Sequence, residues 1–189
     1  MQKNAPDLLS AQAAEEQQKK ISRSAENLLE TMETMLLWSK QQMQQFKPNI
    51  QQLPVDQLFD YLEQFFSTTE HVRLEFSMQP GLTVSSDENY LKAIMQNLTS
   101  NAIKALSKTP NATIKWKAWA ENGQTYISVT DNGPGLSGQQ IKPLFKDEVT
   151  SNAKTGFGLH IIRDLAKAVH CSISVTNLPQ GGVQFILTT

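Results

Sequence analysis

Two glycine-rich turns enclose one long polar segment of the chain, and they constrain its fold more than any other feature. The first is DNGPGL (Asp131–Leu136) and the second is TGFGL (Thr155–Leu159), and together they hold four of the nine glycines in 189 residues. Gly133 and Gly135 allow the backbone to bend and to approach a ligand closely. The second turn opens a predicted helix, where free N–H groups and the helix dipole favour an anion. The pair therefore predicts a loop that seats phosphate groups.

A polar stripe on a predicted helix, Glu88–Leu106, indicates the same kind of ligand. Asn97, Asn101 and Lys104 recur at spacings of four and three, which places them on one helix face. The core face of this helix is already supplied by apolar residues, namely Leu91, Ile94, Leu98, Ala102 and Ala105. Two amides and an ammonium group are costly to bury without partners. A ligand carrying Mg²⁺ and phosphates would satisfy all three, because the amide oxygen suits Mg²⁺ and lysine suits phosphate.

The N-terminal part of the chain predicts one long amphipathic helix. Residues Glu15–Phe46 contain no glycine or proline, and apolar residues recur at helical spacing. These apolar residues are Ile21, Ala25, Leu28, Leu29, Met32, Met35, Leu36 and Met43. Such a stripe suits packing against partner helices. Pro48 and Pro54 bracket the next segment, residues 48–54, which is predicted to be a linker because neither helix propagation nor strand pairing is expected there.

Beyond Pro54 the sequence alternates between helix and strand periods. Helices are predicted near Val55–Thr69, at Glu88–Leu106 with Asp87 as N-cap, and at Phe157–His170. Strands are predicted at Val72–Gln79, Leu82–Ser86, Ala112–Ala120, Gln124–Thr130, Ser172–Asn177 and Gly181–Thr189, with a hairpin turn at Glu121–Gly123. Trp116 and Trp119 should lie on opposite faces of their strand. The sum is an α+β fold, a two-layer α/β sandwich with an open, mostly antiparallel sheet and helices on one face.

The composition excludes several classes of function. The formal net charge is -1, so the basic excess of a nucleic-acid-binding domain is absent and no nucleic-acid partner is expected. No apolar run approaches the roughly 20 residues of a membrane span, and a cytoplasmic location is expected. Cys171 is the only cysteine, which rules out an internal disulfide and a cysteine-based metal cluster. The three histidines are scattered, so a metal site made by protein side chains alone is not expected.

The motifs, taken in order, resemble those of the GHKL superfamily of ATP-binding domains (the Bergerat-type ATP-binding fold). Within it, they resemble the catalytic domain of bacterial sensor histidine kinases. NLTSNAIKAL resembles the N box, DNGPGL the G1 box and TGFGLHIIRDLA the G2 box. The resemblance covers residues 55–189, and residues 1–47 look like the second helix of a histidine kinase dimerisation domain. The predicted domains are therefore residues 1–47, the linker 48–54 and the ATP-binding domain 55–189.

The resemblance implies a role for each motif residue. Asp131 would accept a hydrogen bond from the adenine amino group. Asn101 would hold Mg²⁺, with Asn97 close to the phosphates and Lys104 on a phosphate, and these three form the implied catalytic set. Further implied nucleotide contacts are Gly133 and Gly135 at the adenine end and Gly156, Phe157, Gly158 and Leu159 at the triphosphate. The segment Ser137–Thr155 would form a lid whose candidate phosphate contacts are Lys146, Thr150, Ser151 and Lys154.

The implied function is that of the ATP-binding part of a two-component sensor histidine kinase. It would transfer the γ-phosphoryl group of ATP to a histidine on a dimerisation helix outside this chain, because His71, His160 and His170 lack the acidic and proline neighbours of an acceptor. The implied partners are that helix, a response regulator receiver domain and a second copy of the parent protein, which could be anchored in the inner membrane.

Two alternatives stay open. A GHKL ATPase would carry a glutamate where Asn97 stands. A degenerate nucleotide-binding interaction module would explain the single phenylalanine, Phe145, of a lid motif that has Glu148 at its second place.

Overall fold

The computed structural model describes residues 47–142 and 158–189, together with isolated helical positions between residues 17 and 39. At those isolated positions the apolar side chains of Ile21, Leu28, Met32 and Leu36 are exposed. The remainder of the predicted long helix lies outside the described residues. None of the helices in the described part has the length and apolar composition that a membrane span requires.

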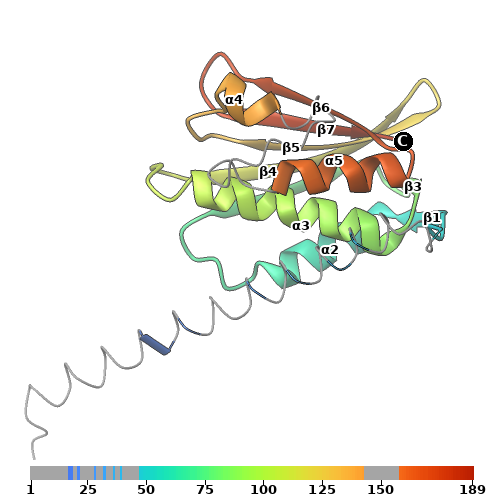
Figure 1. The fold of residues 1–189 in the computed structure, drawn as a ribbon, viewed down its shortest axis with the longest axis horizontal. Coiled ribbons are helices and arrows are strands. Elements are labelled where there is room, and N and C mark those ends of the chain that lie inside the picture. The colour runs from blue at the N-terminus through green and yellow to red at the C-terminus, as the bar shows by residue number, and fades with distance from the viewer. Residues whose placement is uncertain are drawn as a thin grey trace, which may run out of the picture.

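A five-stranded sheet forms one layer of the domain (Figure 1). Its strand order is β2-β4-β5-β7-β6, in which β2 and β4 are parallel and the other neighbours are antiparallel. The strands are β2 (Arg73–Met78), β4 (Thr113–Glu121), β5 (Gln124–Asp131), β6 (Ser172–Asn177) and β7 (Val183–Thr188). The predicted mostly antiparallel sheet is confirmed.

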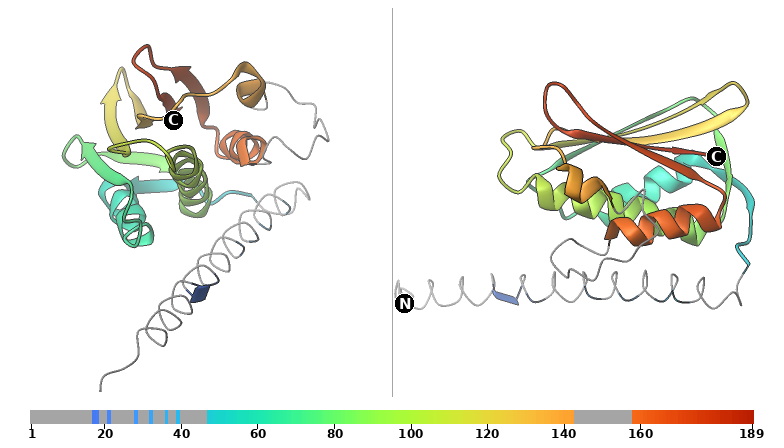
Figure 2. Two further views of the ribbon diagram at one scale, coloured as in Figure 1. Left: turned by 90° about the vertical axis from the view of Figure 1, so that its left-hand side faces the viewer. Right: turned by 45° about the horizontal axis from the view of Figure 1, so that its top comes forward.

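Among the described residues, helices form the second layer and lie on one face of the sheet (Figure 2). They are α2 (Val55–Phe65), α3 (Glu88–Ala105) and α5 (Gly158–Ala168). Their apolar stripes meet the inward side chains of the strands, of which Trp116 of β4 is 1% exposed. Trp119 lies on the opposite face and stacks on Tyr126 with ring centroids 5.2 Å apart. The predicted two-layer α/β sandwich and the opposite placement of the two tryptophans are confirmed.

The expectation that residues 48–54 do not pair was wrong. Gln51–Pro54 forms strand β1, which pairs in antiparallel register with β3 (Thr83–Ser86) as a separate two-stranded sheet. Pro54 is tolerated because β1 is an edge strand of a two-stranded sheet, a position where proline is accommodated. Leu53 is 6% exposed and anchors the strand in the core. This segment is therefore packed onto the domain.

The N-terminus of α3 is capped as predicted. The Asp87 carboxylate accepts hydrogen bonds from the backbone N–H groups of Asn89 (2.9 Å) and Tyr90 (3.2 Å), which satisfies donors that have no partner within the helix. It also accepts one from the backbone N–H of Asn49 (2.7 Å). One carboxylate thus joins the start of α3 to the segment that enters the domain. At the other end of the helix Ala105 is exposed, so its assignment to the core face was wrong.

The hairpin between β4 and β5 also has the predicted turn. Asn122 and Gly123 both have positive φ, 52° and 78°, as a two-residue type I′ turn requires. The short helix α4 (Gly138–Ile141) was not predicted. Ser137 and Gln140 form a capping box at its start, which stabilises a helix too short to give a periodic pattern.

Candidate functional site

Asp131 ends strand β5 and is the centre of the site. Its side chain is only 6% exposed, and Oδ1 accepts a hydrogen bond from the backbone N–H of Gly133 at 2.8 Å. Burial raises the pKa of this carboxyl above its ordinary value, although hydrogen bonds from the N–H groups of Gly133 and Val183 partly offset the effect. A carboxylate has about four lone-pair sites, so Asp131 retains acceptor capacity for a donor on a ligand.

Gly133 and Gly135 shape the loop that follows Asp131. A Cβ on Gly133 would lie 3.0 Å from Asp131 Oδ1 and 3.3 Å from Leu106 Cδ2, so a side chain there would press on the carboxylate. Gly135 has a φ of +81°, a conformation that glycine adopts at little cost. At Gly133 the requirement for glycine is one of space alone, whereas at Gly135 the positive φ also favours glycine.

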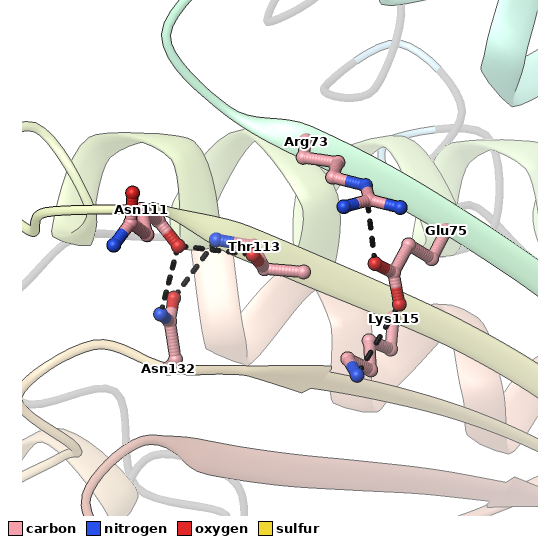
Figure 3. A network of polar contacts seen from close by, with 6 residues as sticks. All are labelled: Arg73, Glu75, Asn111, Thr113, Lys115 and Asn132. Atoms are coloured by element: carbon pink, nitrogen blue, oxygen red, sulfur yellow. Dashed lines mark hydrogen bonds and ion pairs between the residues drawn. The ribbon is translucent and has the colours of Figure 1, made fainter.

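Asn132 ties this loop to the start of β4 (Figure 3). Its Oδ1 accepts a hydrogen bond from the backbone N–H of Thr113 at 2.8 Å, and its Nδ2 donates to the backbone carbonyl of Asn111 at 3.0 Å. Figure 3 also shows the neighbouring ion pairs of Glu75 with Arg73 and Lys115, each at 3.2 Å, on β2 and β4. Those three side chains belong to the strands and make no contact with Asp131 in this network.

Gly182 is a site residue that sequence reasoning missed. It precedes β7 with a φ of +92°, and a Cβ at this position would lie 1.9 Å from the carbonyl oxygen of Asp131. The turn between β6 and β7 therefore packs directly on the backbone that holds the carboxylate. The sequence shows only a Gly181–Gly182 pair, which is typical of any turn.

The polar stripe of α3 is present as predicted. Asn97 is half-buried and its Nδ2 donates to the Ala93 carbonyl at 2.8 Å. Asn101 is half-buried, and within the described residues its side chain has no hydrogen-bond partner. Lys104 is exposed and forms no ion pair with another described residue. The amide oxygen of Asn101 is therefore available to a ligand.

Helix α5 lies beside α3 (Figures 1 and 2). It begins at Gly158, and Leu159 packs partly buried against the core. The remaining predicted contacts lie outside the described residues, namely Lys146, Thr150, Ser151, Lys154, Gly156 and Phe157. Their roles stay predictions.

The donor set of the site fits a metal ion that arrives with a ligand. Within the described part of the chain, no group of three or more histidine, cysteine, aspartate or glutamate side chains could hold an ion. The amide oxygen of Asn101, which has no partner among the described residues, is one hard ligand. Mg²⁺ is commonly held by one or two protein oxygens together with substrate phosphates and water. The residues present therefore fit Mg²⁺ bound through a nucleotide.

The fold and the site together define a two-layer α/β domain of the nucleotide-binding class. The family model described as "Histidine kinase-, DNA gyrase B-, and HSP90-like ATPase" matches residues 86–189, and the chain belongs to this family. The predicted resemblance to this group of ATP-binding domains is confirmed.

Among curated proteins the chain is similar to the "Autoinducer 2 sensor kinase/phosphatase LuxQ" of Vibrio harveyi. The two are 27% identical over 89% of this chain, which spans 21% of the length of that relative. Among solved structures it is similar to the catalytic domain of histidine kinase ThkA, with 23% identity and a TM-score of 0.63 over 74% of this chain and 95% of that one. It is also similar to ThkA in complex with the response regulator protein TrrA, with 22% identity and a TM-score of 0.59 over 74% of this chain and 41% of that one.

Proposed function

We propose that this chain is the ATP-binding, phosphoryl-donating part of a two-component sensor histidine kinase. The observation that carries the proposal is the buried carboxylate of Asp131 at the end of β5, enclosed by Gly133 and Gly182. A buried carboxylate is an acceptor only, so it selects a ligand with a donor group. The exocyclic amino group of adenine is such a donor, and guanine has a carbonyl oxygen at the same place.

The other residues take roles that follow from their chemistry. Asn101, whose side chain has no hydrogen-bond partner among the described residues, offers its amide oxygen to Mg²⁺. Lys104 offers an ammonium group to a phosphate. Gly158 opens α5, whose dipole favours the negative charge of the triphosphate. The bound Mg²⁺ would neutralise charge on the transferring phosphoryl group. The protein then has mainly to position the nucleotide, which is how phosphoryl transfer is largely catalysed.

The acceptor is proposed to be a histidine on a dimerisation helix of the parent protein. The exposed apolar side chains of Ile21, Leu28, Met32 and Leu36 support a helix that packs against other helices in a homodimer. The complex of ThkA with TrrA supports a response regulator as the partner that receives the phosphoryl group. We place this part of the kinase in the cytoplasm, where ATP and the receiver domain are found.

The adenine assignment is tested by Asp131→Asn. An amide keeps an acceptor oxygen but loses the charge, and a charge-assisted hydrogen bond contributes roughly 1.5–3 kcal/mol. We expect ATP affinity to fall about ten- to a hundredfold in a titration with a fluorescent ATP analogue. An unchanged affinity would contradict the assignment.

The kinase reaction is tested by incubating the chain and γ-labelled ATP with an excess of a dimerisation domain that carries the acceptor histidine. Acid-labile label should appear on the supplied domain and not on this chain, because phosphohistidine is acid-labile. Transfer should be slower than in a tethered kinase because the local concentration of acceptor is lost.

Release of inorganic phosphate without label on the acceptor would favour an ATPase instead. Asn97 argues against that outcome, because an amide cannot act as a general base at neutral pH. ATP binding with neither reaction would favour a nucleotide-binding interaction module.

A further inference from the structure

Asn177, the last residue of β6, holds the far end of the loop that begins at Asp131. Its Oδ1 accepts a hydrogen bond from the backbone N–H of Leu136 at 2.9 Å, and its Nδ2 donates to the backbone carbonyl of Leu136 at 2.8 Å. One side-chain amide thus satisfies both backbone polar groups of a residue 41 positions away. This is the pairing that a neighbouring strand would give, supplied here by a single side chain.

The residues on either side of Leu136 are also consistent with a backbone that is held in place there. A Cβ on Gly135 would lie 3.0 Å from Asn177 Oδ1, so the amide has room only because residue 135 is glycine. Ser137 follows at once as the N-cap of α4, where its N–H donates to Gln140 Oε1 at 2.8 Å. No unanchored residue separates the Asn177 contact from the capping box.

The β6–β7 hairpin therefore contacts both ends of the loop Asp131–Leu136. Gly182 packs on the Asp131 carbonyl at one end, and Asn177 holds Leu136 at the other. Asn132 holds the loop to β4 in between. We propose that Asn177 is a positioning residue that preorganises the adenine seat, residues Asp131–Leu136, before nucleotide arrives. The inference rests on the proposed function, because it takes adenine to bind at Asp131.

The proposal implies that the adenine end and the phosphate end of the site depend on different residues. A seat that is ordered in advance does not lose conformational entropy when the base binds. Within the described residues, both hydrogen bonds of the Asn177 side chain go to Leu136 and none goes to the α3 stripe, so its loss should weaken adenine binding while leaving the phosphate end unchanged. The expected loss is about three- to tenfold in affinity for ATP and for ADP alike, since the two hydrogen bonds are solvent-exposed and individually modest.

The test compares the full chain with Asn177→Ala, Asn177→Asp and Gln180→Ala. Alanine removes both hydrogen bonds, and aspartate retains only the acceptor. Gln180 is an exposed residue of the turn between β6 and β7 and serves as the control. Amide hydrogen exchange of the nucleotide-free chain is measured first, then ATP and ADP affinity. We expect exchange at Leu136 to accelerate on the order of tenfold in Asn177→Ala, with an intermediate effect in Asn177→Asp and none in Gln180→Ala.

The outcomes separate this inference from the proposed function. Faster exchange at Leu136 with equal losses of ATP and ADP affinity supports it, as does partial rescue by aspartate. If Asp131→Asn weakens ATP binding but Asn177→Ala changes neither exchange nor affinity, the inference is overturned and the proposed function stands. Faster exchange with unchanged affinity also overturns it, because the anchor would then have no part in binding. Absence of ATP binding by the unmodified chain would overturn both.

Discussion

The two ends of the proposed nucleotide site are built in opposite ways. The adenine seat, Asp131–Leu136, depends on residues that are distant in sequence, since Asn132 contacts Thr113 and Leu136 contacts Asn177, 19 and 41 positions away. The polar stripe of α3 belongs to one helix, where Asn97 bonds to the carbonyl four residues before it. A helix presents its polar stripe as soon as the helix forms. The loop Asp131–Leu136, in contrast, is held in place only when the β6–β7 hairpin packs against it.

The difference implies that mutations at the two ends should separate stability from binding. Changes in the hairpin should damage the fold together with the adenine seat. Changes on the α3 stripe should damage binding and leave the fold intact, because its polar side chains contribute little to the core.

The largest expected effect is that of Gly182→Ala. The new Cβ would meet the Asp131 carbonyl oxygen at 1.9 Å in a backbone conformation with positive φ. Strain and overpacking together should cost about 2–5 kcal/mol in the free energy of unfolding. Gly81→Ala is the matched control, because Gly81 also has positive φ, +68°, but has open space around its Cβ position, and it should cost about 1–2 kcal/mol.

Urea denaturation followed by circular dichroism measures both variants. Equal costs at the two positions would mean that the hairpin does not press on the Asp131 backbone. If Gly182→Ala fails to fold while Gly81→Ala folds, the contact with the Asp131 carbonyl contributes to the loss, since backbone angle alone would not explain it.

The next effect is that of Asn101→Ala on the dependence of ATP binding on Mg²⁺. Loss of a metal ligand should reduce the Mg²⁺-dependent part of the affinity at least about tenfold, since even outer-shell partners of metal sites contribute that much. The free energy of unfolding should change by no more than about 0.5 kcal/mol. ATP titrations with and without Mg²⁺ measure the first quantity, and Asn89→Ala, an exposed asparagine on the same helix, is the control. A normal metal response in Asn101→Ala would place the ion elsewhere.

A pH effect should distinguish the adenine end from the phosphate end. Because burial raises the pKa of Asp131, its carboxyl takes up a proton at a higher pH than an exposed aspartate does. Once protonated it is a weaker acceptor, so adenine-nucleotide affinity should fall as the pH is lowered through this raised pKa. Asp131→Asn does not titrate at this position and should lack that part of the pH dependence, so any remaining change reports on the nucleotide itself. Identical pH profiles for both chains would contradict the assignment of Asp131.

The same raised pKa has a consequence for stability. The stabilising contribution of protonated Asp131 is fully present below the ordinary pKa of the group, and it is lost as the pH rises through the raised value. At neutral pH the buried charge therefore costs stability. Asp131→Asn, which retains an oxygen for the Gly133 N–H, should unfold at the same or a higher urea concentration than the unmodified chain at pH 7. A clear decrease would mean that the charge is stabilised by a contact of its own.

The smallest effect concerns Cys171. This residue directly precedes β6, the first strand of the hairpin that supports the seat. Burial raises the pKa of its thiol to about 11, so the thiol is protonated and slow to react at pH 8. Labelling by a thiol reagent should require the hairpin to open, and Gly182→Ala should accelerate it. Bound ATP should slow labelling if the seat and the hairpin are coupled, and no change with ATP would argue that they open independently.

Much of the fold could be predicted from sequence patterns because many of its features are local. The Asn122–Gly123 turn, the Asp87 cap and the spacing of Asn97 and Asn101 follow from rules that act over a few residues. These features are confirmed in the structure, as is the resemblance to the ATP-binding family that matches residues 86–189. The roles of the motif residues toward nucleotide and Mg²⁺ stay predictions.

Tertiary structure alone decided how the proposed adenine seat is held and how the chain enters the domain. Residues 51–54 became a strand because Leu53 reaches the core and β3 offers a free edge, neither of which is visible in a segment bracketed by prolines. Asn177 and Gly182 look like ordinary turn residues until the hairpin is docked against Asp131 and Leu136. Local preferences act between neighbours in sequence, whereas a glycine required by a carbonyl 51 positions earlier is dictated only by the packing of one element on another.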